Sequence, residues 1–218
     1  VVQGLINNVS SAARANGVPK LDSENSTNFT AGIGLKPNKN FNLTIDYYDI
    51  KVEDRIVLGN PITFSPTNTS AFFVNGIDSR TSGIDVVAGY KNLIVGSGKM
   101  GFNFSGNYTI KNEIDGPVKN PASVAAVNQS VIDKTQEALL FTSRPQFKLI
   151  GGAEYELGKF GFTLNNTVFG PTKFKNAGMS NDLKVEFLTK MVTDLGINFA
   201  ASDKLTLALN VNNLLNVL

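Results

Sequence analysis

The sequence predicts an all-β protein, a segment of an antiparallel transmembrane β-barrel that contributes about eight strands. Three observations support this prediction. Long stretches alternate between apolar and polar residues, as a strand does when its two faces meet different surroundings. The connections between these stretches alternate between short and long. Aromatic residues lie near both ends of the stretches, as in the interfacial belts of membrane barrels.

The clearest alternating stretch runs from Lys99 to Asn112. One parity holds Met100, Phe102, Phe104, Gly106, Tyr108 and Ile110, and the other holds Gly101, Asn103, Ser105, Asn107, Thr109 and Lys111. Tilted membrane strands need about 9–11 residues, and this stretch is long enough to cross a bilayer. Its polar face carries mostly uncharged amides and hydroxyls, which suit the wall of a barrel lumen.

Seven further stretches repeat this pattern. In order they are 26–35, 40–53, 72–90, 147–155, 160–168, 191–199 and 205–211. Beyond Tyr47 the parity reverses, because Ile50 and Val52 now alternate with charged residues. We expect either a bulge at this point or a strand that continues above the membrane, where no apolar face is required.

The connections fall into two classes. The short ones are 36–39, 91–98, 157–159 and 200–203, and the long ones are 1–25, 54–71, 113–144 and 171–186. Bacterial outer-membrane barrels have short periplasmic turns and long extracellular loops, so we expect the short class inside and the long class outside. Tyr47 and Tyr108 then mark the outer belt; Tyr90, Tyr155 and Phe160 mark the inner one.

The connection at 113–144 contains a helical signal. Asn120 and Pro121 suit a cap and a first helical position. A loose apolar stripe follows at Val124, Val127, Val131 and Ala138. We therefore expect one short helix in this loop.

Composition excludes several classes of function. The 218 residues carry a net charge of +2 and include no Cys, His or Trp, which removes disulfides, zinc fingers, thiol nucleophiles and Ser-His-Asp chemistry. We expect no enzyme, no cofactor, no metal site and no nucleic-acid partner. No apolar run reaches the length of a transmembrane helix, and the N-terminus lacks the pattern of a signal peptide. The chain therefore reads as a fragment.

Two local motifs have structural interpretations. Gly96–Gly101 matches G-x-G-x-x-G, but a strand follows instead of the helix that phosphate binding needs, so we interpret it as a turn. Asn-x-Ser/Thr sequons recur within strands because the polar face repeats with a period of two. Among these sequon asparagines, we expect Asn103, Asn107 and Asn165 to line the lumen.

Paired carboxylates are the remaining candidates for chemistry. Asp46 with Asp49, and Asp78 with Asp85, lie close in sequence without a fixed spacing or a histidine. We interpret them as solvated positions in the lumen or above the membrane, and not as acid–base catalysts.

Several segments resemble the C-terminal barrel region of TonB-dependent outer-membrane receptors. They are S-T-N-F-T-A-G at 26–32 with Lys36-Pro37, D-Y-Y-D-I-K-V-E-D-R-I at 46–56, the strand at 72–85, V-T-D-L at 192–195 and V-N-N-L-L-N at 211–216. Leu215 stands where the family usually has Phe, and the family's final loop and closing strand do not follow.

The resemblance implies eight strands of a barrel of about 22 strands, with no plug domain in this chain. It implies a protein of the Gram-negative outer membrane that imports a scarce ligand, such as a siderophore–iron complex or a cobalamin-like cofactor. Its implied partners are outer-membrane lipid, the imported small molecule, and TonB through an N-terminal region absent here. The loops at 54–71, 113–144 and 171–186 would face the ligand.

Two alternatives remain open at this point. A soluble β-sandwich that binds carbohydrate would use the apolar faces as a core between two sheets. An outer-membrane barrel enzyme, such as a lipase or protease, would need a catalytic constellation on the wall, and the absence of histidine counts against it.

Overall fold

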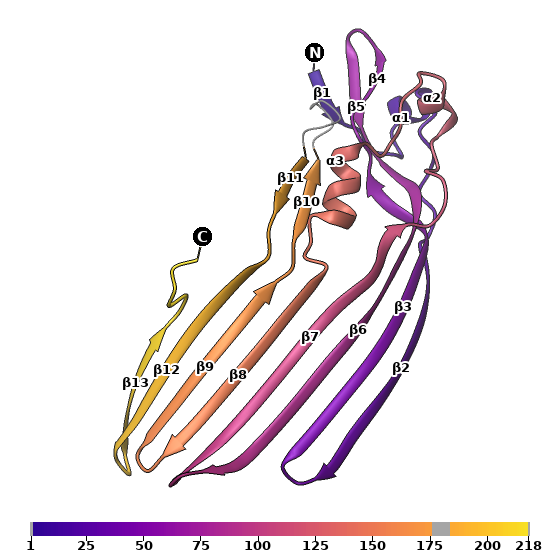
Figure 1. The fold of residues 1–218 in the computed structure, drawn as a ribbon. Helices are drawn as coiled ribbons and strands as arrows, with labels where there is room; N and C mark the ends of the chain where they lie inside the picture. Colours follow the sequence, from indigo (N-terminus) through magenta and orange to yellow (C-terminus); the bar gives the residue numbers. More distant parts are fainter. Residues whose placement is uncertain (1, 176–183, 218) are drawn as a thin grey trace.

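The wall of the molecule is one antiparallel sheet of eight strands (Figure 1). A computed structural model describes residues 2–175 and 184–217. The strands are β2 (Asn25–Asn38), β3 (Phe41–Leu58), β6 (Phe73–Val95), β7 (Gly98–Ile114), β8 (Phe147–Leu157), β9 (Phe160–Phe169), β12 (Lys190–Ser202) and β13 (Leu205–Val211). Each strand pairs with the next in chain order, and β2 and β13 are the two edges. The predicted all-β barrel segment is confirmed, and the barrel is not closed.

The apolar residues of the wall remain on its surface. Phe102 is 44% exposed and Leu209 is 59% exposed, and neighbouring strands repeat this exposure at the same parity. A β-sandwich would bury one such face against a second sheet. No second sheet covers it among the described residues, so the β-sandwich alternative is wrong. No helix in residues 2–175 and 184–217 is long and apolar enough to cross a bilayer.

One end of the sheet consists of tight hairpin turns, which we call the turn end. The connection expected at 91–98 is much shorter, because β6 continues to Val95 and β7 begins at Gly98. Gly96 supplies the left-handed backbone of this turn, at φ 57°. The β6–β7 ladder has a bulge at Lys91 and Asn92. The bulge interrupts the apolar–polar alternation, so the alternation did not show that β6 continues beyond it. The G-x-G-x-x-G motif is therefore turn and strand.

The other end of the sheet, which we call the cap end, has bulges that the alternation did not reveal. In β3 the ladder with β6 is unbroken from Phe41 to Val52, so no bulge follows Tyr47. The register shifts instead between Val52 and Arg55, where Asp54 has φ 55°. The strand then continues to Leu58, so residues 54–58 belong to β3 and not to the expected loop.

A second bulge lies in β7. Gly83 pairs with Thr109 and Ser82 pairs with Lys111, which leaves Ile110 without a partner in β6. An extra residue reverses the parity of everything after it. Lys111 therefore shares a face with Ser82 and Tyr108, and its expected placement on the polar parity with Asn107 and Thr109 is wrong.

The long connections contain structure of their own and lie together at the cap end (Figure 1). They form β1 (Val2–Leu5), α1 (Ser11–Ala15), β4 (Ile62–Ser65), β5 (Asn68–Ala71), α2 (Ala122–Ala125), α3 (Lys134–Glu137), the π-helix η1 (Ala138–Thr142), β10 (Thr172–Lys175) and β11 (Lys184–Phe187). The expected single helix is three short ones, and Pro121 is the residue before α2 and not its first position. Part of the connection at 171–186 lies outside the described residues.

We call segments 2–24, 59–72 and 115–146 the cap. Its centre is a buried apolar cluster that also includes residues from the ends of β3 and β6. The members are Ala13, Val18, Val57, Ile62, Phe72, Val74, Ile77, Val124, Val131, Ile132 and Phe141. Each segment contributes only a few of these residues. The chain's hydrophobic core therefore lies in the cap and not in the membrane-type wall.

Candidate functional site

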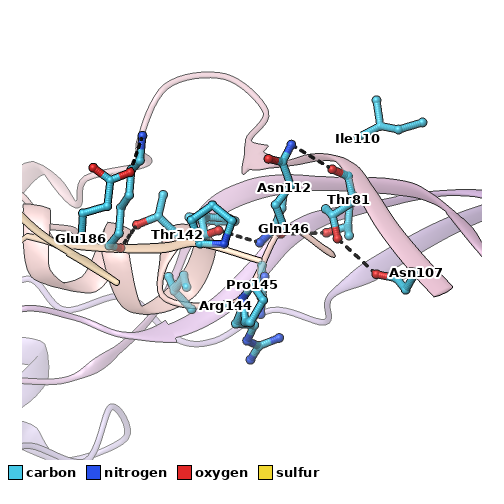
Figure 2. A pocket seen from close by; sticks show the side chains of 15 residues that line it. Thr81, Asn107, Ile110, Asn112, Thr142, Arg144, Pro145, Gln146 and Glu186 are labelled. Carbon is cyan, nitrogen blue, oxygen red and sulfur yellow. Dashed lines mark hydrogen bonds and ion pairs between the residues drawn. The ribbon is translucent and has the colours of Figure 1, made fainter. Parts of the chain in front are cut away.

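A cavity of about 600 Å³ lies at the cap end of the wall. One side is formed by β6 and β7, and the other by the end of segment 115–146 together with the β10–β11 hairpin. In Figure 2 the labelled side chains of Thr81, Asn112, Thr142 and Gln146 lie near one another, and Ile110 stands apart from them. The cavity is therefore assembled from segments far apart in sequence.

The wall side of the cavity is neutral and polar. The Thr81 hydroxyl donates to Asn112 Oδ1 at 3.1 Å, and Asn112 Nδ2 donates to the Phe141 carbonyl at 3.0 Å. The Thr109 hydroxyl donates to Asn107 Oδ1 at 3.5 Å. The bulge at Ile110 brings Asn107, Thr109, Ile110 and Asn112 to the same cavity, which a regular strand would not do.

The opposite side of the cavity is joined to its neighbours by side-chain and backbone hydrogen bonds. The Gln146 amide donates to the Tyr108 hydroxyl at 3.2 Å, and the Gln146 carbonyl accepts the Thr109 N–H at 2.8 Å. The Thr142 hydroxyl donates to the Lys173 carbonyl at 2.7 Å. These bonds join segment 115–146 to β7 and to β10.

The cavity has a cationic lining. Arg55, Arg144 and Lys173 contribute three positive charges, and Glu186 contributes one negative charge. Lys173 Nζ lies 3.6 Å from Glu186 Oε1, and Arg55 Nη1 donates to the Ser79 hydroxyl at 3.4 Å. Arg144 makes no ion pair among the residues that the structure describes. The surplus charge suits an anionic ligand.

Of the predicted lumen asparagines, only Asn107 reaches this cavity. Its amide donates to Asp85 Oδ1 at 2.6 Å and to the Tyr48 hydroxyl at 3.1 Å. Asn103 and Asn165 lie on the same face of the sheet, in register on either side of Gly152. A Cβ on Gly152 would collide with both amides, so the glycine makes room for them. Lumen lining by all three stays a prediction.

The carboxylates pair differently from the sequence expectation. Asp46 and Asp49 point to opposite faces of β3, and Asp49 binds Arg80 at 2.7 Å. Asp78 binds Lys119 at 2.6 Å, seven positions along β6 from Asp85. The structure instead places Asp46 directly across from Asp85. No group of three or more His, Cys, Asp or Glu within the described ranges is arranged to hold a metal ion.

Sequence reasoning did not single out the cationic residues of the cavity. Arg55, Arg144 and Lys173 lie in or beside three separate long connections, with no shared motif. Their one common signal was their place in or next to segments expected to face the ligand. These residues line the same cavity because of the bulge in β7 and the pairing of β10 with β11, and local sequence reveals neither of these features.

The architecture of the wall matches known proteins. The family model described as TonB dependent receptor-like, beta-barrel matches residues 3–214. The search of curated proteins gave no match. Among solved structures, the FrpB iron transporter of Neisseria meningitidis (F5-1 variant) is similar at TM-score 0.63 and 15% identity, over 91% of this chain and 28% of that one.

Two further structures show the same fold. A mutant of the ferric enterobactin receptor PfeA of Pseudomonas aeruginosa has TM-score 0.62 and 14% identity, over 90% of this chain and 26% of that one. The ferric yersiniabactin uptake receptor FyuA of Yersinia pestis has TM-score 0.59 and 14% identity, over 89% and 25%. The chain thus spans about a quarter of the length of these structures. By its match over residues 3–214, the chain belongs to the TonB-dependent receptor-like β-barrel family.

Proposed function

We propose that this chain forms part of the wall and outer rim of an outer-membrane importer, and that the cationic cavity receives an anionic metal chelate of the siderophore–iron class. The observation that carries the proposal is the lining of the cavity: three cations against one carboxylate, in about 600 Å³, beside a neutral polar wall. Clefts lined by one sign of charge concentrate ligands of the opposite sign.

The proposed orientation follows from the connections. The cap end would face the outside and the turn end the periplasm, as in bacterial barrels with long outer loops and short inner turns. The exposed apolar parity of the wall would contact outer-membrane lipid. Ligand captured by Arg55, Arg144 and Lys173 would then meet Asn107, and further along the same face Asn103 and Asn165.

The energy for passage would come from outside this chain. In the proposed mechanism a plug domain fills the lumen, and TonB acts on a region N-terminal to the barrel. The similar structures support an importer in general, because FrpB is an iron transporter, PfeA a ferric enterobactin receptor and FyuA a ferric yersiniabactin uptake receptor. A cobalamin-like ligand would fit the cationic lining less well than a metal chelate that carries negative charge.

The test is binding of ferric enterobactin, as an anionic probe, to the full-length receptor in detergent. Arg144→Gln removes the cation that has no ion pair among the described residues, and we expect binding weaker by about five- to tenfold. Lys204→Gln is the matched control, because it removes one positive charge from the β12–β13 turn at the opposite end of the wall. Equal loss in both variants, or no loss in the first, would overturn the proposal.

A further inference from the structure

Lys119 lies between two carboxylates that come from different strands. Its Nζ is 2.8 Å from Asp54 Oδ1, at the bulge of β3, and 2.6 Å from Asp78 Oδ1, in β6. Lys119 itself belongs to segment 115–146 of the cap. One ammonium group therefore joins the cap to both strands.

The Asp78 carboxylate and the Asp54 backbone are held by bonds that do not involve Lys119. The Asp54 N–H donates to Asp78 Oδ1 at 2.8 Å, and the Asn75 amide donates to the Asp54 carbonyl at 2.6 Å. Both contacts hold the bulge beside Asp78, and the Asp54 and Asp78 carboxylates meet at the same Lys119 ammonium. Two carboxylates that contact the same ammonium group lie close together, and without that cation their negative charges would repel each other.

The backbone around Lys119 follows β6. The Asp115 N–H donates to the Asp78 carbonyl, and the Lys119 N–H donates to the Gly76 carbonyl, both at 2.8 Å. The first five residues of segment 115–146 are thus laid along the strand. The Lys119 side chain completes this attachment with a charge-assisted hydrogen bond to each carboxylate.

The attachment is connected to the cavity through the cap core. Val124 and Val131, which follow Lys119, pack in one cluster with Val57, Ile77 and Phe141. Phe141 also lines the cavity, and its carbonyl accepts the Asn112 amide. The placement of residues 140–146 therefore depends on how the cap sits on β3 and β6.

We propose that Lys119 is a positioning residue of the cavity: by neutralising Asp54 and Asp78 together, it fixes the cap on the wall so that Phe141 to Gln146 face Arg55 and Thr81. The effect of this positioning on ligand binding rests on the proposed function. The positioning itself does not, because it concerns the packing of the cap in the absence of ligand.

The experiment is hydrogen exchange of residues 138–146 in the full-length receptor in detergent, without ligand. Lys119→Met keeps much of the side-chain length but removes the charge, and we expect exchange about three- to tenfold faster there, with β8 and β9 unchanged. Lys119→Arg keeps the cation and should stay within about twofold of the wild type. Lys134→Met is the control, since Lys134 pairs with Glu137 on the exposed side of α3 and, among the described residues, makes no other ion pair.

A charge-specific rescue separates positioning from simple packing. Asp54→Asn in the Lys119→Met background removes one of the two repelling charges, so exchange at 138–146 should return at least halfway to the wild-type rate. A lost packing contact would not be recovered in this way. Unchanged exchange in Lys119→Met, or no recovery in the double variant, would overturn the positioning role.

Binding of ferric enterobactin distinguishes the two proposals. If exchange at 138–146 rises in Lys119→Met and binding weakens while Lys134→Met behaves as the wild type, both are supported. If exchange rises but the probe binds unchanged, Lys119 positions the cap and the ligand site is elsewhere. If the wild type does not bind the probe, hydrogen exchange alone decides the role of Lys119.

Discussion

At the scale of single residues, glycines decide where large polar side chains fit on the wall. Tyr48 lies over Gly83 in the next strand, and Asn103 and Asn165 lie over Gly152. The sequence shows these glycines only as small residues on the polar parity. The need for glycine comes from the large side chain on the neighbouring strand, so the pattern of a single strand does not reveal it.

Gly83→Val tests this arrangement. A Cβ on Gly83 would collide with the Tyr48 hydroxyl and lie 2.6 Å from the Tyr108 carbonyl, which is backbone and does not move easily. We expect a loss of about 1–3 kcal/mol in the free energy of unfolding, because overpacking displaces both the ring and the strand. Thermal unfolding in detergent measures it. Gly34→Val is the control, since nothing lies within 4 Å of its Cβ, and a similar loss there would contradict the explanation.

The pH dependence of the cap also belongs to this scale. The hydrogen bond from Lys119 holds the pKa of Asp78 below its ordinary value of 3.8, and the bonds to Asp54 and Asp78 hold the pKa of Lys119 above 10.5. The stabilisation from Asp78 is present above the pKa of its unfolded state and is lost as pH falls through the lowered folded value. The stabilisation from Lys119 is lost only as pH rises through its raised value.

We therefore expect the protection of residues 115–133 to be flat from about pH 5 to about pH 9 and to fall only under stronger acid. Hydrogen exchange corrected for the intrinsic rate measures this. In Lys119→Met the loss of protection under acid should begin at a higher pH, because Asp78 loses the hydrogen bond that lowers its pKa. A loss of protection already near neutral pH in the wild type would contradict the assignment of this pH dependence to Asp78.

At the scale of elements, the alternation predicted the number, order and direction of all eight wall strands. It failed at their ends, because a bulge moves one residue out of the pattern and reverses the remainder, as at Ile110. The elements of the cap were missed for a different reason. Each cap segment contributes a few core residues, too few for a period to appear, and the core forms only when three segments meet.

Phe72 and Phe73 allow a matched test of the cap core. Phe72 is fully buried in the cap, whereas its neighbour Phe73 is 41% exposed at the start of β6. Phe72→Ala should cost about 3–5 kcal/mol of local stability because it leaves a cavity in the cap, and Phe73→Ala should cost much less. Limited proteolysis should therefore cut the Phe72→Ala cap while the wall strands stay protected. Loss of the wall in the same variant would show that cap and wall fold as one unit.

At the scale of the whole molecule, the sheet is a barrel wall with two open edges. β2 presents 14 residues and β13 presents 7, each with one side of its backbone unpaired in the sheet. Unpaired N–H and C=O groups each cost several kcal/mol in hydrocarbon, and closed barrels avoid this cost by pairing every strand. Contact between the apolar side chains and lipid would not satisfy the backbone groups of these edges.

This balance predicts that the wall is stable in a bilayer only when further strands pair with β2 and β13. Expressed alone, residues 1–218 should aggregate or associate edge to edge, and should not give a compact monomer in detergent micelles. Full-length receptor should resist SDS at room temperature and shift in mobility after boiling. The 218-residue chain and the full-length receptor can be compared by this mobility shift and by size-exclusion chromatography with light scattering. A monodisperse, SDS-resistant monomer of the 218-residue chain would mean that the sheet closes on itself, and the eight strands would then be a complete small barrel and not a segment of a larger wall.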